Sequence, residues 1–128
     1  MRIRSLILAT ALVVSTAVAS WAADVTGTWT AEFETQIGVQ KYVYTFKVEG
    51  EKLTGTAVAE RMGEKQPPVQ ITDGTVKGDQ IAFVETISFD GNQLPLTYTG
   101  TVSGDEIKFS RKVADIATED FVAKRKKD

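Results

Sequence analysis

The chain has 128 residues, a formal net charge of −2 at pH 7, and neither histidine nor cysteine. Histidine is the commonest general base and, with cysteine, the commonest zinc ligand, so Ser-His-Asp, Cys-His and zinc chemistry are excluded. The excess of acidic residues argues against nucleic acid and anionic membrane surfaces as partners, and we expect no cofactor.

Residues 1–22 have the three parts of a secretory signal peptide. Two arginines precede a short apolar run, and Ser20 and Ala22 fit the positions that flank a cleavage site. The run is too short to span a bilayer comfortably, so we expect cleavage after Ala22, with a retained N-terminal anchor as the alternative. Residues 23–128 would then form a single periplasmic or secreted domain of 106 residues, with 13 basic and 17 acidic side chains and no membrane span.

Beyond residue 28 the apolar residues recur at every second position, which is typical of half-buried β-strands. The positions between them are mostly threonine, lysine, glutamate, glutamine and serine. Eight segments follow this pattern, and the first begins at Trp29. They are 29–33, 42–48, 53–59, 69–71, 81–89, 94–102, 107–109 and 121–123.

Three similar sequences join these segments in pairs. Thr75–Phe83 reads TVKGDQIAF and returns 26 positions later as TVSGDEIKF at Thr101–Phe109, while Lys47–Gly55 reads KVEGEKLTG. Each has a glycine and an acidic residue between two apolar strand ends, and glycine supplies the positive φ that a tight hairpin needs. Consecutive hairpins indicate an antiparallel meander, because strands joined by tight turns are neighbours in space.

Two segments interrupt the alternation. Residues 62–68, MGEKQPP, are polar and end in two prolines, which a central strand does not tolerate, so we predict a loop there. Residues 112–120, KVADIATED, are predicted to form a loop or a single helical turn before the last strand. Aspartates beside glycines are common in turns, so we expect no metal site, with calcium binding as the alternative for Asp73, Asp79, Asp90 and Asp105.

The predicted domain has ten aromatic residues, and all ten share a face with the aliphatic side chains. No predicted helix is long enough to cover this apolar face, so the sheet must pack on itself. Eight antiparallel strands achieve this by closing into a barrel, which also removes exposed edges. The predicted fold is therefore all-β, an eight-stranded antiparallel up-and-down meander barrel, and an open two-sheet sandwich is the alternative.

The first strand contains Gly27-Thr28-Trp29, the third contains LTGT at Leu53–Thr56, and the last contains a basic residue. In these features the chain resembles the lipocalin-like and avidin-like barrels of the calycin group. It looks closest to the small exported lipocalin-like domains of bacteria that have no assigned activity. The resemblance implies that Gly27 and Trp29 close one end of the barrel, with a basic side chain from a late strand packed across the indole.

Arg125 is the first candidate for that basic side chain. It shares a face of the last strand with Phe121 and Ala123, so it can point inward over Trp29. Arg111 is the second candidate, because it is in phase with the apolar residues of the preceding strand. A desolvated contact of this kind contributes a cation–π interaction of about 1–2 kcal/mol.

Glu85 interrupts the apolar face of the segment 81–89. A buried carboxylate must be paired or protonated, because isolating its charge costs several kcal/mol. Arg111 and Arg125 are the inward-facing cations that can meet it, and the sequence does not decide between them. We favour a satisfied internal ion pair, and the alternative is a polar anchor for the head group of a ligand.

Tyr42, Tyr44 and Tyr98 are the inward residues that carry a hydroxyl group. We interpret them as core residues, and the alternative is that they hold a ligand. The main hypothesis for function is a non-enzymatic barrel that binds a small apolar or amphiphilic molecule in a shallow aromatic cup. The cup would be formed by Tyr42, Tyr44, Phe83 and Tyr98, with Glu85 and Arg111 as polar anchors.

Two other hypotheses stay open. A barrel filled by its own side chains can act as an interaction module that recognises an exported protein or a cell-wall glycan. Such a module would use outward threonine rows, such as Thr54 and Thr56 or Thr97 and Thr99. The third hypothesis is an enzyme that relies on glutamate and arginine, such as an isomerase, which the absence of histidine and cysteine disfavours.

Overall fold

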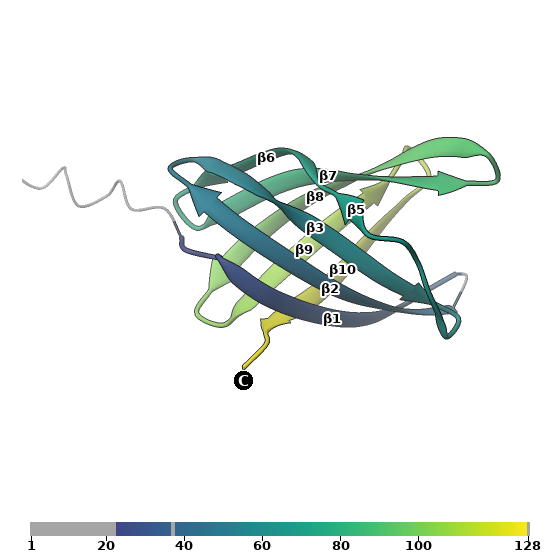
Figure 1. Cartoon of the computed structure of the whole chain (residues 1–128), viewed down its shortest axis with the longest axis horizontal. Coiled ribbons are helices and arrows are strands. Elements are labelled where there is room, and N and C mark those ends of the chain that lie inside the picture. Colours follow the sequence, from purple (N-terminus) through teal and green to yellow (C-terminus); the bar gives the residue numbers. More distant parts are fainter. Residues whose placement is uncertain (1–22, 37, 128) are drawn as a thin grey trace, which may run out of the picture.

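The computed structural model describes residues 23–36 and 38–127, so the predicted signal peptide lies outside the described residues. Ten β-strands account for most of this part of the chain, and no helix occurs in it (Figure 1). The strands are β1 (Gly27–Thr35), β2 (Gly38–Glu49), β3 (Lys52–Arg61), β4 (Glu64–Lys65), β5 (Val69–Gln70), β6 (Thr72–Lys77), β7 (Gln80–Phe89), β8 (Asn92–Ser103), β9 (Glu106–Val113) and β10 (Ala117–Arg125).

Eight of the strands close into an antiparallel barrel, and β4 and β5 lie outside it. Each barrel strand pairs with its neighbours along the chain, in the order β1, β2, β3, β6, β7, β8, β9 and β10, and β10 pairs back with β1. This last ladder is short, with Trp29 opposite Arg125 and Thr30 opposite Lys124. The predicted meander barrel is confirmed, and the two-sheet sandwich is wrong.

The three repeated hairpins form at one end of the barrel. Their turns contain Gly50, Gly78 and Gly104 with φ angles of 64°, 60° and 61°, a conformation that is costly for a residue with a Cβ atom. Trp29 lies toward this end, which we name the Trp29 end. The turns that join β1 to β2, β7 to β8 and β9 to β10 lie at the opposite end, the far end (Figure 1).

The fourth barrel strand differs from its predicted position. It is β6, at 72–77, whereas most of the predicted segment 69–71 forms β5 and pairs with β3. The alternation is hidden in β6 because Asp73 has a φ of 55° and the pairing with β7 shifts register between Thr72 and Thr75. Such a bulge places two consecutive residues opposite one, so period two fails locally.

The two segments predicted as loops contain more strand than expected. Residues 64–65, within the predicted loop 62–68, form β4 and pair with the end of β3. Within 112–120, β9 continues to Val113 and β10 begins at Ala117, so a tight turn replaces the predicted loop or helical turn. Polar residues hid both segments, because β4 is exposed outside the barrel and the start of β10 has mostly polar side chains.

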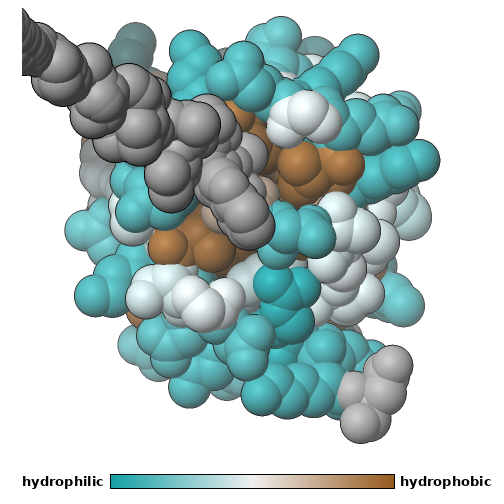
Figure 2. All heavy atoms as spheres, turned by 90° about the vertical axis from the view of Figure 1, so that its left-hand side faces the viewer, coloured by the Kyte–Doolittle hydropathy of each residue, from teal (hydrophilic) through white to brown (hydrophobic). Residues whose placement is uncertain are grey.

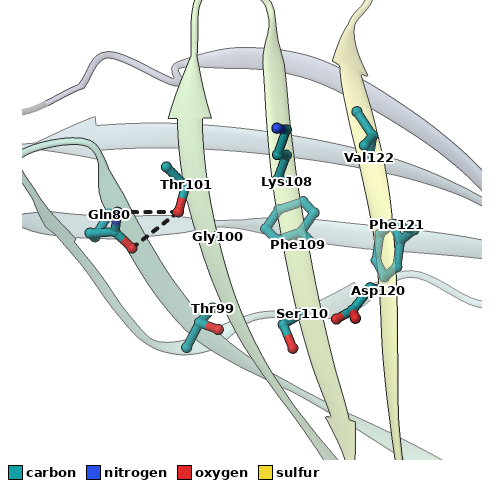
Figure 3. A pocket seen from close by; sticks show the side chains of 10 residues that line it. All are labelled: Gln80, Thr99, Gly100, Thr101, Lys108, Phe109, Ser110, Asp120, Phe121 and Val122. Carbon is teal, nitrogen blue, oxygen red and sulfur yellow. Dashed lines mark hydrogen bonds between the residues drawn. The ribbon is translucent and has the colours of Figure 1, made fainter.

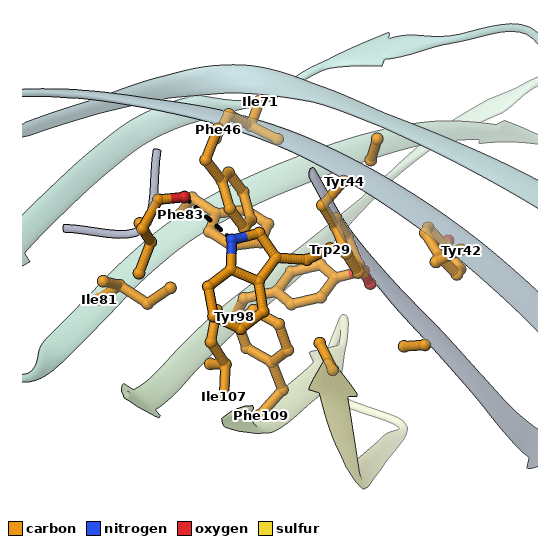
Figure 4. Close-up of a cluster of buried hydrophobic side chains, with 14 of the residues drawn as sticks. Trp29, Tyr42, Tyr44, Phe46, Ile71, Ile81, Phe83, Tyr98, Ile107 and Phe109 are labelled. Atoms are coloured by element: carbon orange, nitrogen blue, oxygen red, sulfur yellow. Dashed lines mark hydrogen bonds between the residues drawn. The ribbon is translucent and has the colours of Figure 1, made fainter. Parts of the chain in front are cut away.

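Aromatic rings fill the interior of the barrel (Figure 4). Phe83 and Tyr98 stack with their ring centroids 4.3 Å apart, and Tyr44 meets Tyr98 edge to face at 5.8 Å. All three side chains are fully buried. Nine of the ten aromatic residues predicted to face inward lie in this core or pack against it.

Phe89 is the exception among the ten, because its side chain is 53 % exposed. The prediction that it faces the core is wrong. The β7–β8 hairpin extends past the rest of the barrel at the far end, so no opposite wall covers position 89 (Figure 1). Alternation indicates which face of a strand a residue occupies, and it does not indicate where the opposite wall ends.

Trp29 is fully buried at the Trp29 end. Its indole Nε1 donates to the carbonyl oxygen of Val25 at 2.9 Å, and the guanidinium Cζ of Arg125 lies 4.5 Å from the indole centroid. The same guanidinium donates to the backbone carbonyl groups of Asp24 and Thr26, each at 3.1 Å. The predicted cation–π contact is present, and Arg125 also ties the chain before β1 to the last strand.

Gly27 lies beside this contact. Its φ of 133° is one that residues with side chains rarely adopt, and a Cβ atom there would lie 3.4 Å from Nη1 of Arg125. Gly27, Trp29 and Arg125, the three residues predicted to close the barrel, therefore lie together. Figure 2 shows this end of the molecule, where hydrophilic side chains form the rim and apolar surface is confined to the middle.

Trp29→Ala should lower the free energy of unfolding by about 3–5 kcal/mol, because it leaves a cavity in a packed core and removes the contact with Arg125. Equilibrium denaturation in urea measures the change. Val43→Thr, at an outward position of β2 that is 41 % exposed, is the control and should cost less than about 1 kcal/mol. A loss for Trp29→Ala as small as that of the control would show that the indole does not hold the barrel closed.

Candidate functional site

A cluster of polar side chains is buried in the far half of the barrel. Glu85 on β7 and Arg111 on β9 are only 1 % and 2 % exposed. Tyr98 on β8 lies directly opposite Arg111, so the two side chains share the inward face. Tyr42 on β2 reaches both from across the barrel. Three consecutive strands, β7, β8 and β9, and the distant strand β2 thus supply one cluster.

Both carboxylate oxygens of Glu85 accept hydrogen bonds from tyrosine hydroxyl groups. Tyr42 donates to Oε2 at 3.0 Å, and Tyr98 donates to Oε1 at 2.7 Å. Because the single hydroxyl proton of Tyr98 is used in this bond, the 2.9 Å contact between the hydroxyls of Tyr44 and Tyr98 is donated by Tyr44. All three tyrosine hydroxyls therefore have partners inside the core.

Arg111 is the cation that accompanies Glu85, and the other candidate cation lies at the Trp29 end. Nη1 of Arg111 lies 3.9 Å from Oε1 of Glu85 and donates to the hydroxyls of Tyr42 and Tyr98 at 3.0 Å and 3.1 Å. On its other side the guanidinium donates to Glu119 from Nε at 2.9 Å and from Nη2 at 2.6 Å. Every nitrogen of this guanidinium has a partner, which is the arrangement of a satisfied internal ion pair.

Burial changes the ionisation of this cluster. It raises the pKa of the Glu85 carboxyl above the ordinary glutamate value, although the hydrogen bond from Tyr98 and the charge of Arg111 act in the opposite direction. Burial also raises the pKa values of Tyr44 and Tyr98 well above the ordinary tyrosine value, so both stay neutral hydrogen-bond donors. Glu85 is therefore easier to protonate than an exposed glutamate.

A cavity of about 230 Å³ lies beside Glu85 in the wall of the barrel, between β3 and β7, and we name it the side cavity. The wall is incomplete here because the β6–β7 ladder ends at Thr72 and Val84, and residues 66–69, which run along β3, cross the gap beyond it without a register partner on β7. The polar lining residues are Arg61, Gln66, Glu85, Thr86, Ser88 and Gln93, and the apolar ones are Ala59, Pro67, Pro68, Val69 and Ile87.

Glu85 is the one residue of the six predicted ligand-binding residues that lines the side cavity. Tyr44, Phe83 and Tyr98 are fully buried and occupy the space of the predicted cup with their own rings. Tyr42 does not line the cavity itself, but it is hydrogen-bonded to two residues that do, Glu85 and Arg61. The candidate site therefore lies in the wall of the barrel, and not on the barrel axis where the sequence predicts the cup.

Arg61 is the residue of this site that the sequence analysis missed. Its Nη2 donates to the hydroxyl of Tyr42 at 3.1 Å, and its side chain lines the side cavity. A signal was present, because Ala57, Ala59 and Arg61 share one phase of the alternation at the end of β3. The contribution of 66–69 had no such signal, since its position over the cavity depends on the closed barrel.

A second hollow, of about 430 Å³, lies on the outer face of β8, β9 and β10, and we name it the outer depression (Figure 3). Thr99, one of the four threonines proposed for an outer recognition surface, lines it, and the other three do not. At its edge the side chains of Gln80 and Thr101 exchange hydrogen bonds. Its polar residues are Gln80, Thr99, Thr101, Lys108, Ser110 and Asp120.

Glu85→Gln should remove part of the pH dependence of folding stability. Because burial raises the pKa of Glu85 in the folded state, the folded chain keeps this proton at pH values where the unfolded chain has lost it. The free energy of unfolding therefore falls as pH rises from the unfolded-state pKa through the folded-state pKa. Urea denaturation at a series of pH values, from about 4 to about 8, should show a smaller fall for the variant than for the wild type.

Two comparisons make this measurement specific. Asp24 and Asp105 have lowered pKa values, because of hydrogen bonds from Thr26 and from Lys127 respectively, so their contributions have the opposite sign and are lost as pH falls. Glu106→Gln, at an exposed position of β9, is the matched control. Equal pH profiles for Glu85→Gln and the wild type would contradict a raised pKa at Glu85.

Comparison with known proteins gave no match to a family model, a curated protein or a solved structure. The resemblance to calycin barrels accordingly stays a prediction. Within the part of the chain that the structure describes, no group of three carboxylate, histidine or cysteine side chains could hold a metal ion. The same part contains no helix long and apolar enough to cross a membrane. Function is therefore argued from the chemistry of the site.

Proposed function

We propose that this protein is an exported, non-enzymatic binding protein that holds a small amphiphilic molecule in the side cavity. Export rests on the signal-peptide pattern of residues 1–22. Binding rests on a cavity that combines charged, polar and apolar lining groups, which is the usual composition of a small-molecule site.

The observation that carries this proposal is the position of Glu85. Its side chain is 1 % exposed and is nevertheless part of the cavity lining. Keeping a carboxyl group at such a place is costly, and here Tyr42, Tyr98 and Arg111 are arranged around it. A fixed polar group beside a small apolar space gives orientation and specificity to a bound molecule.

The same contacts favour binding over catalysis. Both oxygens of Glu85 already accept hydrogen bonds from Tyr42 and Tyr98, and Arg111 is held by Glu119. A general base must reach a substrate proton directly or through one water molecule, and here each oxygen of Glu85 is already held by a hydrogen bond from inside the barrel. The cluster is therefore better suited to orient a ligand than to transfer a proton.

The outer depression supports a second candidate function. Its hydroxyl, amide and charged groups are suited to hydrogen bonding with a cell-wall glycan or a polar protein surface. This is the interaction-module hypothesis, now located on β8, β9 and β10 around Thr99 and Thr101. The two candidates lie on different parts of the barrel, so one mapping experiment separates them.

Chemical-shift mapping by NMR with a panel of small amphiphiles tests the main proposal. A bound amphiphile should shift the backbone amides of Gln66, Val69, Glu85 and Ile87, which surround the side cavity. Ile87→Trp should weaken binding by about tenfold or more, because the larger ring occupies the cavity and removes contacts worth at least about 1.4 kcal/mol.

Leu94→Trp is the matched control, because Leu94 is the register partner of Ile87 on β8, is also half-buried, and is not part of the cavity lining. Its affinity should be close to that of the wild type. Shifts confined to Thr99, Thr101 and Lys108 on addition of a glycan fragment, with none around the side cavity for any amphiphile, would favour the second candidate and contradict the first.

A further inference from the structure

Arg61 is the charged group of the site with spare hydrogen-bonding capacity. A guanidinium group has five N–H donors, and one hydrogen bond from Arg61 is formed, to the hydroxyl of Tyr42 at 3.1 Å. Within residues 23–36 and 38–127, no carboxylate forms an ion pair with it. Its remaining donors are therefore available to the side cavity that it lines.

The other charges of the cluster are already matched. Glu119 lies 2.6 Å from Nη2 of Arg111, which is a direct ion pair. Glu85 accepts from Tyr42 and Tyr98, so its oxygens face donors that belong to the barrel. A cationic ligand would meet Arg61 without finding a free carboxylate, whereas an anionic ligand would find a guanidinium with free donors.

Most of the apolar lining lies on the segment that crosses the gap and on β7, and Ala59 of β3 completes it. Pro67, Pro68 and Val69 come from that segment, and Ile87 comes from β7. At about 230 Å³ the side cavity is smaller than the space of about 300–1,000 Å³ that drug-sized ligands occupy. It therefore suits a short hydrocarbon chain better than a large ring system or a long acyl chain.

We propose that the side cavity selects a short-chain carboxylate, whose head group accepts hydrogen bonds from Arg61 and whose hydrocarbon tail packs on Pro67, Pro68 and Ile87. The planar guanidinium matches the two oxygens of a carboxylate, and charge-assisted bonds of this kind are about twice as strong as neutral ones. This inference rests on the proposed function, since it names the chemical class of the molecule bound at the same site.

Three probes with six carbon atoms each and different head groups test the selection: hexanoate, hexan-1-ol and hexylamine. Titration of the wild-type protein, followed by the amide shifts of Gln66 and Ile87, gives an affinity for each. Hexanoate should bind about tenfold or more tightly than either of the others, because only it gains the charge-assisted bonds to Arg61.

Variants assign this preference to Arg61. Arg61→Gln should reduce the affinity for hexanoate to about that for hexan-1-ol and leave the affinity for hexan-1-ol almost unchanged. Lys65→Gln removes an exposed positive charge of the same hairpin that does not line the cavity, so it should leave both affinities unchanged.

The outcomes separate this inference from the function on which it rests. If none of the three probes shifts the cavity amides, neither the inference nor the proposed function holds. If hexan-1-ol or hexylamine binds there as tightly as hexanoate, the cavity binds amphiphiles and the selection for carboxylates is wrong. If Arg61→Gln melts well below the wild type, the comparison of the three probes on the wild-type protein decides the question.

Discussion

The buried carboxyl group of Glu85 is the constraint on which the far half of the barrel depends. A charge that is 1 % exposed has to be compensated by neighbours, because its desolvation costs several kcal/mol. The neighbours here come from β2, β8 and β9, so Tyr42, Tyr98 and Arg111 meet only when the barrel has closed. Glu119 then holds the guanidinium from β10. Each of these buried side chains depends on the others for its hydrogen bonds or its ion pair. Replacing any one of them therefore leaves a buried polar group without its partner.

The two ends of the barrel are stabilised in different ways. At the Trp29 end an indole fills the interior, and the guanidinium of Arg125 lies over the indole ring. This cation stays partly exposed to solvent. Between the ends, stacked rings such as Phe83 and Tyr98 occupy the axis. Because the axis is filled, space for a small molecule is found in the wall, where the β6–β7 ladder has ended. The same irregularity that weakens the sheet at that point therefore creates the candidate site.

Local sequence pattern was enough to predict much of this architecture. Period-two alternation and the repeated glycine hairpins predict an eight-stranded meander, and the resemblance to calycin barrels, together with the phase of Arg125, predicts that this side chain lies over Trp29. The partner of Glu85 could not be chosen in the same way, since Arg111 and Arg125 are both in phase and only the position along the barrel separates them. The side cavity depends on where residues 66–69 cross the gap, which is a property of the closed sheet and leaves no periodic signal.

The prediction that Phe89 faces the core is wrong for a related reason. The sequence of β7 does not indicate how far the strands on the opposite side of the barrel extend, and here they end before they can cover this side chain.

We propose that the side cavity beside Glu85 and Arg61 binds a ligand and that the barrel axis, which is filled by aromatic rings, does not. A crystal structure of the protein grown with hexanoate tests this most directly, since it locates the molecule without relying on a change in affinity. We expect electron density for the carboxylate within hydrogen-bonding distance of the Arg61 guanidinium, with the tail along Pro67 and Pro68. Hexanoate density among the rings of Tyr44, Phe83 and Tyr98, or only in the outer depression, would contradict it.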